Sequence, residues 1–143
     1  MRTHTYESSL ALIGTSVPEH LVADAEVPIL TGSQAQGDLL IVPILPTDGM
    51  DNVTWEPVPD TGIQVVRGEA TGNTHWLHRG FDSPGVEWAR IDREMFLGAI
   101  RIPEGQSALL LHTDEHGSNG IGPGCYAIHG KREQADVIRH VAD

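Results

Sequence analysis

Frequent turn residues are the feature that most constrains how this chain can fold. Sixteen glycines and nine prolines are spread along its 143 residues and leave few long uninterrupted segments. Glycine supplies unusual backbone dihedrals and proline fixes φ, so both residue types mark turns. Short segments between closely spaced turns favour strands over helices. We therefore expect a single β-rich domain over residues 1–143, mainly antiparallel and folded as a compact barrel or sandwich.

Apolar runs of strand length lie between these turns. The run 39–45 is apolar on both faces, which is typical of a buried strand, and Pro43 marks its end or a bulge. A hairpin turn is expected at 92–94, and residues 46–62, which include Trp55, are expected to form a long surface loop. The other expected strands cover residues 10–13, 27–30, 63–70, 74–78, 86–91, 95–102, 108–109 and 127–128.

The C-terminal stretch has a different periodicity. Val137, Ile138 and Val141 follow helical spacing and predict a short helix over residues 133–142 that docks on the sheet. The sequence has no glycine-rich phosphate loop and no alternation of strands with helices, so a doubly wound parallel sheet is not expected. The predicted class is all-β with one short C-terminal helix. The sequence does not distinguish a cupin-like from a jelly-roll-like arrangement of the strands.

The charge of the chain argues against several kinds of partner. Twenty acidic residues against nine basic ones give a formal net charge of −11 at pH 7. A nucleic-acid groove needs a basic surface, and attachment to anionic membranes needs clustered lysine or arginine. We therefore expect neither nucleic-acid binding nor membrane binding, and we expect a protein partner or a homo-oligomer instead.

Features that direct a protein out of the cytoplasm are missing from the sequence. The N-terminal residues carry no apolar core of a signal peptide, and no segment approaches the roughly 20 apolar residues of a membrane span. Cys125 is the only cysteine, so no internal disulfide can form. We expect a cytoplasmic protein, or one carried in a particle that is assembled in the cytoplasm.

Histidine is frequent, and two clusters of it are candidates for a metal site. His75 and His78 lie in the first cluster, whereas His112 and His116 lie in the second with two carboxylates between them. Imidazole and carboxylate ligands drawn from two strands suit Zn, Fe, Mn or Ni, as in cupin-like barrels. The competing interpretation is that residues 113–122 form a solvated loop. The candidate ligands are His75, His112 and His116, with a carboxylate from Asp114 or Glu115.

Covalent catalysis has little support in the sequence. Cys125 has no base that clearly shares its strand face, and a Gly-x-Ser-x-Gly nucleophile elbow does not occur. Trp55, Trp76 and Trp88 are expected to act as core or interface anchors. The sequence therefore favours a protein without enzymatic activity but does not decide whether it is an enzyme. It identifies no catalytic residue and no site for an organic cofactor.

Five short motifs follow one another along the chain. They are Gly37–Pro43 (GDLLIVP), Gly68–Gly72 (GEATG), Glu115–His116, Pro123–Gly124 with Tyr126, and Val141–Asp143. The set resembles a small family of functionally uncharacterised bacterial and phage-type β-rich proteins of about this length. The resemblance implies no activity.

The same resemblance implies a particular placement of histidines. It implies a His-x-His pair after the Thr-Gly and a histidine three residues before that of the Glu-His motif. Here Asn73 and Thr113 stand at two of those positions. His75 and His116 remain, and His112 lies one residue out of register. Because a one-residue shift on a strand reverses the face, a metal site of the family type would be incomplete in this chain.

Two interpretations of function remain open. The first is a non-enzymatic structural or accessory domain that acts by assembly with itself or within a larger complex, such as a viral or other multi-subunit particle. The segment around Trp55 is its expected contact surface, and it needs no cofactor. The second is a cupin-like metal-binding protein or metalloenzyme, which predicts that His75, His112 and His116 converge within a few ångströms on a divalent transition metal.

Overall fold

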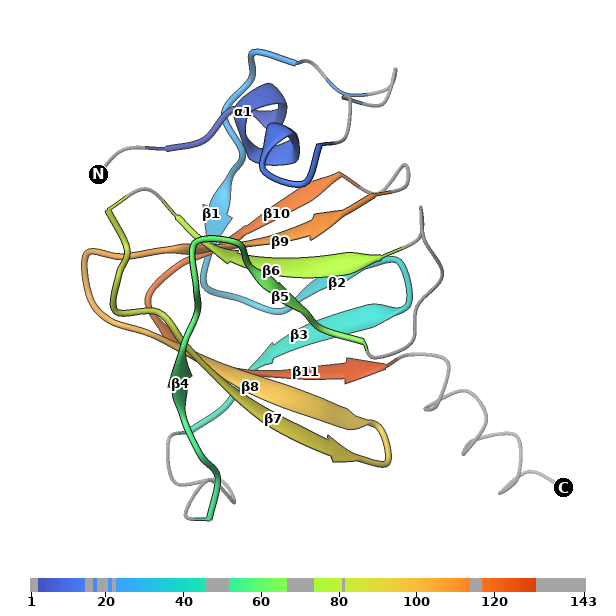
Figure 1. Ribbon diagram of the computed structural model, residues 1–143, viewed down its shortest axis with the longest axis vertical. Coiled ribbons are helices and arrows are strands. Elements are labelled where there is room, and N and C mark those ends of the chain that lie inside the picture. The colour runs from blue at the N-terminus through green and yellow to red at the C-terminus, as the bar shows by residue number, and fades with distance from the viewer. Residues whose placement is uncertain are drawn as a thin grey trace, which may run out of the picture.

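Two β-sheets pack face to face in the computed structural model, which describes residues 3–14, 17, 21, 23–45, 52–66, 74–80, 82–113 and 117–130 (Figure 1). The five-stranded sheet runs in spatial order β1 (Ile29–Leu30), β10 (Ser118–Ile121), β9 (Ala108–His112), β6 (His75–Arg79) and β5 (Ile63–Gln64). The six-stranded sheet runs β2 (Gln34–Gln36), β3 (Leu39–Pro43), β11 (Gly124–Gly130), β8 (Phe96–Ile102), β7 (Glu87–Arg93) and β4 (Glu56–Pro57).

The pairing of the strands confirms the mainly antiparallel all-β class. Every pair of neighbouring strands named above is antiparallel except β1 and β10, which are parallel. Of the two expected architectures, the described part of the chain adopts the sandwich, since its two sheets form no closed barrel. No helix in that part has the length and hydropathy needed to cross a membrane.

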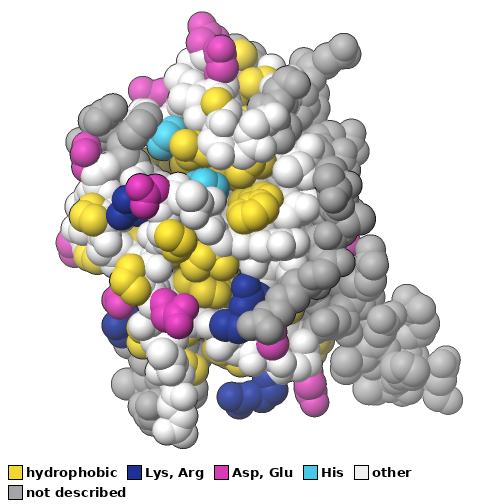
Figure 2. All heavy atoms as spheres, in the orientation of Figure 1, with side chains coloured by type: hydrophobic (Ala, Val, Ile, Leu, Met, Phe, Trp, Pro, Cys, Tyr) yellow, Lys and Arg dark blue, Asp and Glu magenta, His cyan; other side chains and the backbone are white. Residues whose placement is uncertain are grey.

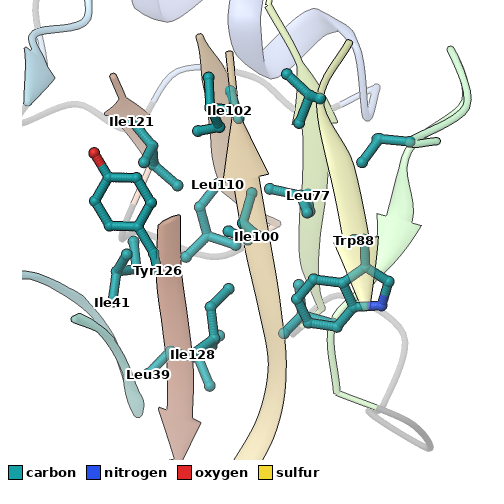
Figure 3. Close-up of a cluster of buried hydrophobic side chains, with 14 of the residues drawn as sticks. Leu39, Ile41, Leu77, Trp88, Ile100, Ile102, Leu110, Ile121, Tyr126 and Ile128 are labelled. Carbon is teal, nitrogen blue, oxygen red and sulfur yellow. The ribbon is translucent and has the colours of Figure 1, made fainter. Parts of the chain in front are cut away.

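The main core lies between the inner faces of the two sheets (Figure 3). Side chains alternate along a strand, so every second residue faces this core. Leu77 and Leu110 reach it from the five-stranded sheet, and Ile100 and Ile128 reach it from the six-stranded sheet; all four are fully buried. Removing such a side chain from water stabilises the fold by about 1.5–3 kcal/mol.

The N-terminal helix shows that one strand prediction is wrong. The range 10–13 belongs to the end of α1 (Tyr6–Ala11) and the turn that follows it. A capping box starts the helix, because Ser8 N donates to Thr5 Oγ1 (3.0 Å) and Thr5 N donates to Ser8 Oγ (2.9 Å). Its apolar residues follow helical spacing and cover the outer face of the five-stranded sheet. The helix and the sheet thus form a second hydrophobic cluster, apart from the main core, which contains Tyr6, Ile13, Val27, Trp76, Leu109 and Leu111.

Other predictions are confirmed, refined or fall outside the described residues. The hairpin turn at 92–94 connects β7 and β8, and Asp92 and Glu94 there adopt positive φ values of 49° and 52°. The range 46–62 is not wholly a surface loop, because it contains β4 and the buried Val58. The helix expected over 133–142 lies outside the described residues.

The edges of both sheets are short. The four edge strands, β1, β2, β4 and β5, contain only two or three residues each, and β4 includes Pro57. Short edges and proline leave few backbone groups for pairing with a strand of another chain. If the protein assembles, a face of the sandwich is therefore a better contact surface than an edge.

Candidate functional site

His75 and His112 lie side by side on the inner face of the five-stranded sheet. His75 begins β6 and His112 ends β9, and the register of the two strands pairs these residues directly. Strand alternation places them on the same face as the core residues Leu77 and Leu110. Both histidines are buried, with 4% and 2% of their surface exposed. Two histidines from separate sequence clusters therefore meet at one end of the core.

The backbone explains why the two imidazoles approach so closely. The carbonyl oxygen of His75 accepts a hydrogen bond from Val65 N (3.0 Å), and His112 N donates to the carbonyl oxygen of Gly117 (2.9 Å). These two backbone groups thus bond to other segments and not to each other. The pair therefore occupies a non-hydrogen-bonded position of the β6–β9 ladder, where opposing side chains come closest. The two rings stack with their centroids 4.0 Å apart and their planes at 19°.

Gln36 brings an amide group to the same end of the core. Its Nε2 donates to Leu110 O (2.7 Å) and Asn119 Oδ1 (2.9 Å), with a longer contact to Gly117 O (3.4 Å). Gly117 also accepts the bond from His112 N, so Gln36 lies next to the histidine pair. Within the described ranges no group donates to Gln36 Oε1, although this residue is buried. Leaving such an oxygen unsatisfied costs about 1–3 kcal/mol, which makes it a candidate acceptor for a ligand.

The histidine pair can supply two metal ligands only if a ring moves. Stacked rings hold their nitrogen lone pairs roughly parallel, whereas two ligands of one zinc ion point at a common centre about 2.0–2.1 Å from each nitrogen. At least one ring must therefore turn about its Cβ–Cγ bond. No group of three His, Cys, Asp or Glu side chains suited to a metal ion gathers among the described residues. His116, the third candidate ligand, lies outside them, as do Asp114 and Glu115.

His78 faces away from this pair and serves packing. Three residues after His75 on the same strand, it points to the opposite face of the sheet. Its buried ring packs on Gly62, where an added Cβ would lie only 2.6 Å from His78 Cδ2. In the described part of the chain no group bonds to His78 Nε2. Desolvation penalises the charged ring and lowers the pKa of His78, so the ring is neutral at pH 7.

Trp55, the candidate interface residue, lies on the outer face of the six-stranded sheet. Arg101 points outward because its neighbours Ile100 and Ile102 point into the core. The guanidinium carbon of Arg101 lies 4.4 Å from the centre of the half-buried Trp55 ring. Arg101 Nε in turn donates to Glu87 Oε1 at 2.6 Å. A cation–π contact thus holds Trp55 against the sheet with part of its surface exposed.

A cleft of about 530 Å³ opens between β4, β5 and β7, at the far side of the sandwich from β1 and β2. Figure 2 shows hydrophobic side chains gathered over this part of the molecule, with acidic and basic side chains beside them. Pro57, Pro59 and Ile63 form apolar walls, and Glu56, Trp88 and Arg90 supply the polar groups.

Arg90 connects the two sheets at this cleft. Its Nη2 donates to Gln64 O (2.6 Å), and its Nη1 donates to Val65 O. Gln64 is the last residue of β5, which pairs with β6, and Val65 directly follows it and bonds to His75. No sequence pattern marks Arg90 or Gln36, because the hydrogen bonds of both side chains join segments that are distant in the sequence.

The chain matches a family of proteins over more than half of its length. DUF8820, a domain of unknown function, matches residues 35–131, more than half of the sequence. The chain belongs to the DUF8820 family. No curated protein and no solved structure matches it.

The DUF8820 match contains both candidate sites. It starts within β2 and ends just after β11, so it includes Gln36, His75, His112, Trp88 and Arg90. Helix α1 and strand β1 lie outside it. Because the family has no known function, it confirms the expectation of an uncharacterised family and supplies no activity.

Proposed function

We propose that the protein is a non-enzymatic domain that binds a divalent transition-metal ion at the end of the core where His75 and His112 meet. The observation that supports this most is the meeting of the two imidazoles in core positions, where their strand neighbours Leu77 and Leu110 are apolar. Burying polar rings costs free energy relative to burying apolar ones. Coordination of a metal ion would offset that cost.

The ligand set follows from the chemistry of the residues. Imidazole nitrogen suits zinc and nickel, which distinguishes them from magnesium and calcium. His75 and His112 would supply two ligands, and His116, four residues further along the sequence, would supply the third. Three protein ligands leave a position open for an exchangeable ligand. Gln36 Oε1, next to the pair, would accept a hydrogen bond from that ligand.

Urea denaturation with and without zinc tests this proposal. At a zinc concentration 100 times the dissociation constant, we expect the free energy of unfolding to rise by about 2.7 kcal/mol. His75→Phe and His112→Phe keep an aromatic ring in the stack but remove the nitrogens, so each should abolish the rise. His129→Phe is the matched control, because His129 lies on β11 against Phe96, outside the pair (ring centroids 5.1 Å apart).

Two results would count against the metal site. One is an unchanged unfolding curve for the wild-type protein with either zinc or nickel. The other is an equal response of the His112→Phe and His129→Phe variants, which would place the metal elsewhere.

A second candidate function is assembly, with copies of itself or within a larger complex. The half-buried Trp55, held by Arg101 on a sheet face, favours it. Aromatic residues that are ordered but partly exposed are frequent anchors of protein interfaces. The exposed Leu45, which follows β3 in the same sheet, adds apolar surface (66% exposed).

Sedimentation velocity over a range of protein concentrations tests assembly. We expect the wild-type protein to self-associate and Trp55→Ala to shift the equilibrium toward monomer by about tenfold or more, as for an interface hot spot. Leu12→Ala, at the exposed C-cap of α1, is the control and should associate like wild type. A wild-type protein that is monomeric at all concentrations would remove self-association as its function.

A further inference from the structure

We propose that the cleft between β4, β5 and β7 binds a zwitterionic amino acid with an apolar side chain. This site is separate from the histidine pair and does not depend on a metal ion. Three features of the cleft support it: an indole N–H donor on its wall, opposite charges on its walls, and an apolar surface beside them.

The donor is the indole nitrogen of Trp88. This residue is only 3% exposed, and its six-membered ring packs over Gly98 in the core. Figure 3 shows the nitrogen on the side of the ring that faces away from Ile100 and Leu77. Among the described residues no group accepts a hydrogen bond from this nitrogen, and the atom is not fully enclosed by the protein. Because Trp88 lines the cleft, its N–H group can donate to an acceptor of a ligand bound there.

The charges on the walls match a carboxylate next to an ammonium group. Glu56 stands directly opposite Trp88 in the β4–β7 ladder, and Arg90 follows Trp88 on the same face. Arg90 is anchored on the carbonyl oxygens of Gln64 and Val65, and the Asp92 carboxylate, 3.6 Å from Arg90 Nη1, offsets part of its charge. A ligand carboxylate beside Trp88 Nε1 and Arg90 would leave its ammonium group facing the exposed Glu56 carboxylate.

The remaining walls and the size suit a small apolar side chain. Pro57, Pro59 and Ile63 offer apolar surface beside the polar groups. The cleft volume, about 530 Å³, falls within the range of roughly 300–1,000 Å³ that is usual for small-molecule sites. L-Leucine is therefore a suitable probe.

Isothermal titration calorimetry with three matched compounds tests the proposal. L-Leucine carries both charges, 4-methylpentanoate lacks the ammonium group, and 3-methylbutylamine lacks the carboxylate. With EDTA present to exclude metal effects, we expect saturable leucine binding with a dissociation constant near 1 mM, and binding about tenfold weaker for each analogue. Failure of the metal site would leave this result unchanged, so the two proposals are tested separately.

Two variants locate the binding. Trp88→Phe keeps an aromatic ring but removes the donor, and Glu56→Gln removes one charge at an exposed position; each should weaken leucine binding by about tenfold. Glu56→Gln should leave 4-methylpentanoate binding no weaker than in the wild type. Trp55→Phe, on the outer face, is the control. No saturable leucine binding, or equal affinities in wild type, Trp88→Phe and Glu56→Gln, would overturn the proposal.

Discussion

Gly98→Ala is expected to lower the free energy of unfolding by about 3 kcal/mol. Gly98 lies on β8, where the Trp88 ring from β7 crosses over it. A Cβ at this position would overlap the far edge of the indole and lie 2.8 Å from the carbonyl oxygen of Ala89. The ring cannot move away freely, because it is buried in the core. Urea denaturation monitored by circular dichroism measures this loss.

A double-mutant cycle separates the overlap with Trp88 from other effects of Gly98→Ala. Phenylalanine at position 88 lacks the outer ring atoms that approach Gly98, so Gly98→Ala should be less destabilising in a Trp88→Phe background, by about 1 kcal/mol or more. Equal losses in the two backgrounds would mean that the indole does not set the requirement for glycine.

Gly62→Ala is expected to destabilise the protein by about 3 kcal/mol, compared with about 1–2 kcal/mol for Gly105→Ala. Both glycines adopt left-handed backbone conformations, with φ values of 81° and 78°, so alanine is strained at either position. They differ in their surroundings. A Cβ at Gly62 would overlap the His78 ring, whereas a Cβ at Gly105 would meet nothing within 4 Å.

Removing the His78 ring provides the control for this comparison. In a His78→Ala background the excess destabilisation by Gly62→Ala over Gly105→Ala should disappear, since only backbone strain remains. Thermal or urea unfolding of the variants measures the difference. If the excess persisted without the ring, the packing of His78 on Gly62 would not explain the need for glycine there.

The spacing of turn residues was enough to predict the sheet class and most strands of the second half. The hairpin between β7 and β8 follows from short-range features, because polar residues that tolerate positive φ separate two strand-length segments. The apolar run at 10–13 predicts a strand, but it belongs to the end of a helix that the capping residues Thr5 and Ser8 begin. The surface that this helix covers exists only after β9 and β10 pair, so a local pattern does not show it.

The candidate metal site was predictable only in part. The clustering of histidines identified His75 and His112, but their direct opposition depends on the register of β6 against β9. Gln36 belongs to a three-residue edge strand with no distinctive pattern, and its burial arises where β2 meets β10 across the two sheets. The cleft was missed because Glu56 lies in a range predicted as a loop, and only its pairing with Trp88 brings it there.

Anomalous X-ray scattering at the zinc edge, from crystals grown with one equivalent of zinc, tests the metal site most directly. We expect a single strong peak about 2.0–2.1 Å from one nitrogen of His75 and one of His112, with the rings turned out of their stack. Rings that remain stacked with centroids near 4.0 Å, with no peak between their nitrogens, would contradict it.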